Sequence, residues 1–248
     1  MKKAAFCVSI LFALCVAMVA QDSSYYKAIE KAASAPIQPK EFKQMEQDAL
    51  KDYSRPESYE RLATAFGNST ERVWAVIYGE VFCNLSPDAD HRNAIGSLVY
   101  QAYEKSLSNN GGKLSVDLTE NAQAAQGQAP FESRFEFAFL MAAAPLGDGL
   151  MPFSVQKLTR IRKSQLSLWS QKKLPSSELM RWQQAVIAAG NFDAYNYWLF
   201  QSARPDEFNQ WAKEHQEQYQ AWLDWLAKNK FSIQTPDFQR LYLIRGRH

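Results

Sequence analysis

The chain has 248 residues, of which 46% are hydrophobic and 22% charged, and it carries 28 Lys and Arg against 26 Asp and Glu. This length and apolar content suffice for a sizeable buried core. The near balance of charge excludes the overall basic surface that draws a protein to nucleic acid, so we expect no nucleic-acid partner.

The first twenty residues have the layout of a secretory signal peptide. Two lysines precede an apolar run, 4–20, and polar residues begin at Gln21. The run is short for a transmembrane helix, which needs about 20 apolar residues. We expect cleavage after Ala20 (or after Ala17), export to the periplasm or the medium, and a single mature domain, 21–248. An uncleaved membrane anchor is the alternative.

The mature chain is then electrically neutral and holds one cysteine. Without Lys2 and Lys3, 26 basic residues remain against 26 acidic ones, and the loss of Cys7 and Cys15 leaves only Cys83. One cysteine cannot form an intramolecular disulfide, so the fold must rest on its apolar core. Seven Trp, eleven Tyr and fifteen Phe supply the large buried surfaces that such a core needs.

Apolar residues recur with a helical period through most of the mature chain. Ile95, Leu98, Val99 and Ala102, for example, lie at positions i, i+3, i+4 and i+7. Proline with an acid shortly after it is typical of a helix start, because both are favoured in the first turn. Five prolines have this setting: Pro39, Pro56, Pro87, Pro205 and Pro236. The sequence therefore predicts an all-α protein built from short helical hairpins.

A pattern of aromatic and small residues occupies positions 56–89. It consists of Tyr59, Leu62, Ala63 and Phe66, followed by Ala75, Leu85 and Pro87. This pattern resembles a tetratricopeptide repeat, from which it departs at Gly79 and Phe82. The resemblance implies an α-solenoid that binds a peptide or protein on a concave face, without catalysis. A non-repetitive helical bundle is the alternative.

One segment, around 108–130, lacks the helical period. It opens with Asn-Asn-Gly-Gly, which is typical of a turn, and Leu114, Val116 and Leu118 then alternate with polar residues. A stretch rich in Gln, Ala and Gly follows. We expect one short strand inside a long irregular loop.

The stretch 81–91 brings together residue types that could perform nucleophilic catalysis. Cys83 and His91 could form a thiol–imidazole pair, but no glycine-rich turn nearby offers donors for an oxyanion. The repeat-like frame places Cys83 at the end of one helix, and Asp88 and Asp90 at the start of the next, where acids are favourable. We interpret the stretch as a helix end and a helix start, with no catalytic residue.

Metal and cofactor sites have no support in the sequence. The three histidines are His91, His215 and His248. Zinc sites need clustered His and Cys at short spacing, which these positions do not provide. We predict neither a metal site nor a cofactor.

Two carboxylates could serve an enzyme that acts on cell-wall polymer. Glu132 and Glu136 lie four residues apart, on one face of a predicted helix. Hydrolysis of a glycosidic bond uses a pair of carboxyl groups, although they usually come from different elements. A periplasmic hydrolase or lyase, with Glu132 or Glu136 as its acid, is therefore the alternative to a binding protein.

A local excess of positive charge is the best candidate for a binding surface. No acid occurs between Asp148 and Glu178, while basic residues accumulate there, among them Lys157, Arg160, Arg162 and Lys163. An aromatic stripe runs from Phe208 to Leu226 on one predicted helix, and Trp225 lies off its centre. If its ring is exposed, Trp225 is the best single candidate for a residue that contacts a partner.

The patterns together favour an exported, all-α, non-catalytic binding or scaffolding module. We expect its partner to be another protein or peptide, with an anionic component of the cell envelope as the alternative. If the signal peptide is cleaved, we expect no stable membrane insertion.

Overall fold

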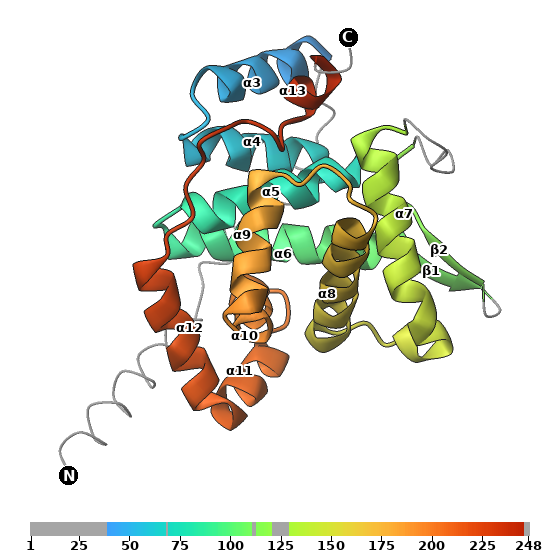
Figure 1. The fold of residues 1–248 in the computed structure, drawn as a ribbon, viewed down its shortest axis with the longest axis vertical. Helices are drawn as coiled ribbons and strands as arrows, with labels where there is room; N and C mark the ends of the chain where they lie inside the picture. The colour runs from blue at the N-terminus through green and yellow to red at the C-terminus, as the bar shows by residue number, and fades with distance from the viewer. Residues whose placement is uncertain (1–38, 68, 111–112, 121–128, 246–248) are drawn as a thin grey trace.

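The computed structural model describes residues 39–67, 69–110, 113–120 and 129–245. The predicted signal peptide lies outside these residues. In the described part, the chain forms eleven α-helices, one 3-10 helix and one two-stranded antiparallel sheet (Figure 1). The all-α fold predicted from the sequence is confirmed.

The first half of the fold is a stack of four helices. They are α3 (Pro39–Lys51), α4 (Pro56–Phe66), α5 (Arg72–Leu85) and α6 (Ala89–Ser106). They follow one another down the view in Figure 1, and α5 packs along both α4 and α6. Prolines begin α3 and α4, as their sequence setting predicts.

Gly79 explains how closely α5 approaches its neighbours. A Cβ atom at this position would lie 2.4 Å from Cγ2 of Val99 and 3.5 Å from Cβ of Ala63. The departure from the repeat pattern at Gly79 therefore lies where α5 is so close to its neighbours that only a residue without a side chain fits. The helical hairpin predicted within 56–89 is present as α4 and α5, while membership of the tetratricopeptide family stays a prediction.

The segment after α6 is more regular than expected. β1 (Leu107–Asn110) continues from α6 and pairs antiparallel with β2 (Lys113–Val116), so that Leu107 lies opposite Val116. The predicted strand is present as β2, whereas β1, with which it pairs, was not predicted. Asparagine has low strand propensity, and β1 obtains its order from pairing with β2. The part of the predicted loop at 121–128 lies outside the described residues.

The second half of the fold contains the helices between β2 and the C-terminal segment. They are α7 (Phe131–Ala143), the 3-10 helix η1 (Ala144–Leu150), α8 (Val155–Gln171), α9 (Glu178–Ala188), α10 (Phe192–Leu199), α11 (Pro205–Glu214) and α12 (Gln216–Lys228). In Figure 1, α7, α8 and α9 stand upright against the first stack. The short α10 contacts α6, α8, α9, α11 and α12, and so joins the two halves.

The aromatic stripe predicted on one helix lies on two. His215 has non-helical backbone angles (φ −125°, ψ 39°) and separates α11 from α12. Its Nδ1 lies 3.0 Å from the carbonyl oxygen of Trp211, and its ring stacks on that of Trp211. The stripe residues Phe208, Trp211, Tyr219 and Trp222 are nevertheless buried, because both helices turn the same apolar face inward.

The C-terminal segment returns to the N-terminal helix. Arg240, the first residue of α13 (Arg240–Arg245), forms two hydrogen bonds to the carboxylate of the buried Glu46 in α3, at 2.6 and 2.9 Å. Pro236 lies four residues before α13, so the prediction that it begins a helix was wrong. One continuous cluster of buried apolar residues extends from Ala49 to Phe238. Among the described residues, no helix combines the length and the apolar character that crossing a membrane requires.

Candidate functional site

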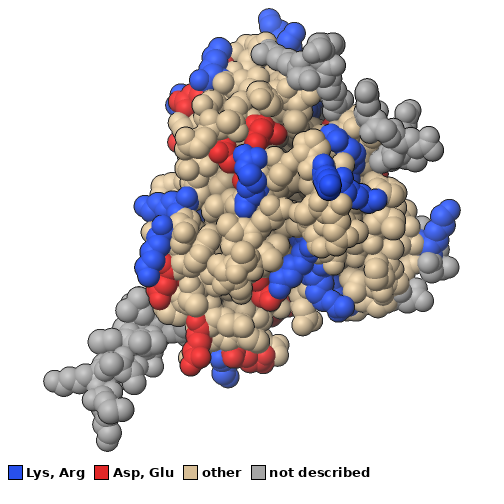
Figure 2. All heavy atoms as spheres, viewed as in Figure 1, with Lys and Arg blue, Asp and Glu red and all other residues tan. Residues whose placement is uncertain are grey.

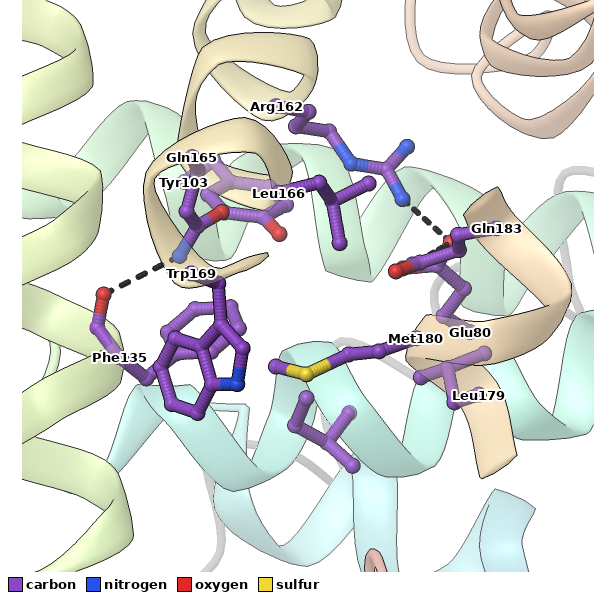
Figure 3. A pocket seen from close by; sticks show the side chains of 11 residues that line it. Glu80, Tyr103, Phe135, Arg162, Gln165, Leu166, Trp169, Leu179, Met180 and Gln183 are labelled. Carbon is purple, nitrogen blue, oxygen red and sulfur yellow. Dashed lines mark hydrogen bonds and ion pairs between the residues drawn. The ribbon is translucent and has the colours of Figure 1, made fainter. Parts of the chain in front are cut away.

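A buried ion pair lies where the two halves of the fold meet. Glu80 of α5 and Arg162 of α8 are 1% and 2% exposed and are joined by an ion pair. Nη2 of the guanidinium contacts Glu80, and Nη1 donates to Oδ1 of Asn196. Gln183 donates to Oε1 of Glu80 at 2.7 Å (Figure 3). The hydroxyl of Tyr195 donates to the same oxygen at 2.6 Å. These bonds connect α5, α8, α9 and α10.

The ion pair is a structural element with no room for a substrate beside it. The adjoining cavity, drawn in Figure 3, has a volume of about 10 Å³, which is the space of one water molecule. Desolvation raises the pKa of Tyr195, so its hydroxyl stays protonated and able to donate to Glu80. A buried charge pair of this kind is stable only when hydrogen bonds satisfy both groups, as they do here.

The burial of Arg162 corrects one prediction from the sequence. Arg162 was expected on a basic surface, but it lies on the buried face of α8 with Leu158 and Leu166, four residues away on either side. Its charge is compensated by Glu80, the one acid in the apolar helix α5. Two signals in the sequence could have indicated this pair. One is a single acid in an otherwise apolar helix, and the other is an arginine within the apolar stripe of a second helix.

The three remaining basic candidates for the binding surface lie on α8 and differ in their contacts. Arg160 is exposed, whereas Lys163 pairs with Asp193 at 2.9 Å and the Nζ of Lys157 donates to the carbonyl oxygen of Pro152 at 2.8 Å. Figure 2 shows basic and acidic side chains interspersed over the visible face. A binding role for these three residues stays a prediction.

Trp225 is half-buried within a group of aromatic rings. Its ring centroid lies 6.0 Å from that of Trp182 and 5.8 Å from that of Trp222. Much of its surface is therefore used in packing α12 against α9. Because of this packing, Trp225 exposes less aromatic surface to a partner than a fully exposed contact residue would.

The stretch 81–91 is a helix end followed by a helix start, as interpreted from the sequence. α5 ends at Leu85, and Asp88 caps α6 by accepting hydrogen bonds from the backbone N–H of Asp90 and His91, at 3.0 and 3.1 Å. Nδ1 of His91 lies 2.8 Å from a carboxylate oxygen of Glu60 in α4. The imidazole therefore contacts a carboxylate of the first hairpin.

Cys83 is placed as an interior residue of this helix end. It is 2% exposed, and its Sγ donates to the carbonyl oxygen of Arg92 over 3.4 Å. Desolvation raises the pKa of the thiol, so the thiolate needed for nucleophilic attack does not form at neutral pH.

The two glutamates considered for acid catalysis differ in their surroundings. Glu132 is half-buried, whereas Glu136 is 6% exposed and accepts hydrogen bonds from the backbone N–H of Leu118 and Thr119, at 2.6 and 2.9 Å. Desolvation raises the pKa of Glu136. Its carboxylate holds the segment after β2 against α7, which accounts for its burial without catalysis.

Glu71 supplies a pH-dependent prediction in the same region. Desolvation and the nearby charge of Glu132 raise the pKa of Glu71, although Thr119 donates to its carboxylate at 2.8 Å. Between the ordinary value of about 4.3 and the raised native value, the folded state binds more protons than the unfolded state, so stability falls as pH rises. We expect Glu71→Gln to remove this fall.

The measurement for Glu71→Gln is urea denaturation at pH 4 and pH 7. The free energy of unfolding of the variant minus that of the wild type should be larger at pH 7 than at pH 4, because only the wild type loses stability over this range. Glu57→Gln, on α4, is a suitable control because Glu57 is exposed. An equal difference at both pH values for Glu71→Gln would contradict the raised pKa.

An open groove lies between the start of α6 and the end of α12. It has a volume of about 410 Å³ and is formed by residues 83–87 and Arg92 on one side, and by Trp198 and residues within 223–231 on the other. Its lining is mainly apolar and includes Leu85, Pro87, Trp198, Leu223, Leu226 and Phe231. We refer to it as the α12 groove.

The α12 side of the groove is a regular helix face. Leu223, Leu226 and Ala227 lie at i, i+3 and i+4, and Lys230 follows at i+7 just beyond the helix. Residues at this spacing share one side of a helix. Trp222, one position before Leu223, is fully buried and does not line the groove. Its burial holds α12 against the core beside the groove.

Arg92 forms the opposite side of the groove. Its Nη1 donates to the carbonyl oxygens of Ser86 and Pro87 at 3.2 and 3.1 Å, and its guanidinium lies 5.2 Å from the ring centroid of Trp198. Desolvation lowers the pKa of Arg92 from its ordinary value. The guanidinium is thus held in place by backbone carbonyls and an aromatic ring.

A hydrogen-bonded chain connects the groove to the buried ion pair. Nδ2 of Asn84 donates to the hydroxyl of Tyr195 at 2.9 Å, and that hydroxyl donates to Glu80. Oδ1 of Asn84 is buried and accepts no hydrogen bond from the described residues. The wall of the groove is therefore connected through hydrogen bonds to the buried ion pair.

No sequence pattern predicts the groove. The stretch 81–91 holds residue types that could perform catalysis and the stripe 208–226 holds aromatic residues, but nothing in either pattern indicates that they meet. Contacts of α10 with α6 and α12 bring them together. Among the described residues, no group of three His, Cys, Asp or Glu side chains is arranged to hold a metal ion.

Comparisons with models of known protein families, with curated proteins and with solved structures found no match. The function is therefore argued from the geometry of the chain itself.

Proposed function

We propose that this protein is a non-catalytic binding module that holds a peptide segment of a partner protein in the α12 groove. Export through the predicted signal peptide, and the tetratricopeptide-like character of residues 56–89, belong to the same proposal. The observation that carries it is the groove, which combines an open shape with an apolar lining and a few polar groups.

The dimensions and the lining of the groove support this function. Binding sites for small ligands and peptide side chains have volumes of about 300–1,000 Å³ and are mostly apolar. The groove, at about 410 Å³, falls within this range. An amphipathic segment that inserts side chains into such a groove is a common mode of peptide recognition.

The surroundings of the groove also suit binding without a large structural change. One wall is attached through Asn84 and Tyr195 to the buried pair of Glu80 and Arg162. The other wall is α12, which is fixed by the fully buried Trp222. Pre-organised walls reduce the entropy that binding must overcome.

Two alanines of α12 allow a matched test. Ala227 lines the groove and Ala221 does not, while both are exposed. We expect Ala227→Trp to fill the groove and weaken peptide binding at least about tenfold, since a loss of about 1.4 kcal/mol corresponds to that factor. Ala221→Trp should change the affinity by less than about twofold, since exposed substitutions away from a site have small effects.

The experiment uses the purified mature protein. Peptides of twelve residues are selected from a random library on the wild type, and their affinities for the three proteins are measured by fluorescence anisotropy. Equal loss of binding in both tryptophan variants, or in neither, would contradict a peptide site in the groove.

A further inference from the structure

The charges that line the α12 groove have one sign. Arg92 and Lys230 line it, and no Asp or Glu does. Building on the proposed function, we propose that the groove recognises a peptide segment in which an acidic side chain, Asp or Glu, is flanked by apolar side chains. Such a ligand complements both the cations and the apolar lining.

Arg92 retains donors for a carboxylate. A guanidinium has five N–H donors in a planar fork, and the described contacts of Arg92 to Ser86 and Pro87 use Nη1 alone. Its guanidinium carbon lies 5.2 Å from the ring centroid of Trp198, and both residues line the groove. Burial removes water from the guanidinium and disfavours its positive charge. A ligand carboxylate would compensate for this lost solvation through charge-assisted hydrogen bonds.

Lys230 supplies the second cation from the other wall. It follows Asn229, the C-terminal cap of α12, and its side chain is exposed. It comes seven residues after Leu223, so that the apolar face of α12 ends in a positive charge at the groove. A ligand that lies along this face would meet apolar side chains first and a cation at the end.

A peptide fits this lining better than a fatty acid, although both could combine a carboxylate with apolar groups. Asn84 and Ser86 are polar and line the groove beside its apolar residues. Polar side chains can form hydrogen bonds with a peptide backbone, whereas a hydrocarbon chain offers no donor or acceptor. The open form of the groove also suits a chain that continues beyond it on either side.

The test compares peptides and proteins that differ by one charge. The selected peptides are acetylated and amidated, so that only side chains carry negative charge, and each acid is replaced by its amide. We expect the wild type to bind the acidic form about tenfold more tightly. Lys230→Gln should remove most of this preference, whereas Lys228→Gln, at an exposed position of α12 outside the groove lining, should retain it.

Arg92→Gln extends the test to the other wall. It should also reduce the preference for the acid, and its thermal unfolding is recorded because Arg92 contacts the backbone. Lys230→Gln keeps the test decisive if Arg92→Gln does not fold.

The possible results separate this inference from the proposed function. In one result, Ala227→Trp blocks peptide binding, but the wild type shows no preference for the acidic form. This result would overturn the inference and leave the groove as a peptide site. Preference for the acid that persists in Lys230→Gln and Arg92→Gln would overturn it as well. Binding only to peptides with a free terminal carboxylate, or displacement of every peptide by dodecanoate at lower concentration, would assign the groove to another ligand.

Discussion

Arg162→Met is expected to lower the free energy of unfolding by about 3–5 kcal/mol, which is the usual effect of removing one partner of a buried ion pair. Glu80 would keep its donors, Gln183 and Tyr195, but would lose the cation that compensates its charge. Asn196 would lose a donor at the same time. Urea denaturation followed by tryptophan fluorescence measures the loss.

Two further variants distinguish loss of the pair from loss of the side chain. Arg160→Met, on the same helix but exposed, should change stability by less than about 0.5 kcal/mol. The double variant Glu80→Gln with Arg162→Met should recover at least half of the loss, because no uncompensated charge is buried. An Arg162→Met protein as stable as Arg160→Met would contradict the buried ion pair.

Gly96→Ala should destabilise the protein by about 1–3 kcal/mol, although alanine is normally the better helix former. A Cβ atom at position 96 would lie 2.2 Å from the carbonyl oxygen of Leu199. That oxygen belongs to the backbone of α10, so α10 itself would have to move. Because Trp198 precedes Leu199 and lines the groove, the shift should also weaken peptide binding.

Gly149→Ala is the control for this effect. A Cβ atom at Gly149 would have no heavy atom within 4 Å, so the substitution should be nearly neutral in stability and in binding. Thermal denaturation and fluorescence anisotropy on both variants give the two readouts. Equal behaviour of the two variants would mean that α6 and α10 do not approach as closely as described.

The helical fold could be predicted because its signals are local. Prolines mark the starts of α3, α4 and α11, and the repeat-like pattern in 56–89 places the ends of α4 and α5. The helix boundary between Cys83 and Asp88 followed from the same frame, and it removed a catalytic interpretation that the residue types alone would allow.

Features that depend on distant contacts were missed. Arg162 was assigned to the surface because a run of basic residues usually faces solvent, and only the fold brings Glu80 to it, 82 positions away. The break at His215 was missed because the apolar spacing continues through it. The groove joins residues around 85 to residues around 226, and no local pattern indicates that they meet.

The most direct test of the central claim, that the α12 groove holds a peptide, is to locate a bound peptide. A selected peptide carrying a benzophenone is cross-linked to the purified protein by light, and the attached residues are identified by mass spectrometry. The account predicts attachment within 83–92 and 223–231. Attachment to Phe137 and Met141, two exposed apolar side chains on α7, with none at the groove, would contradict it.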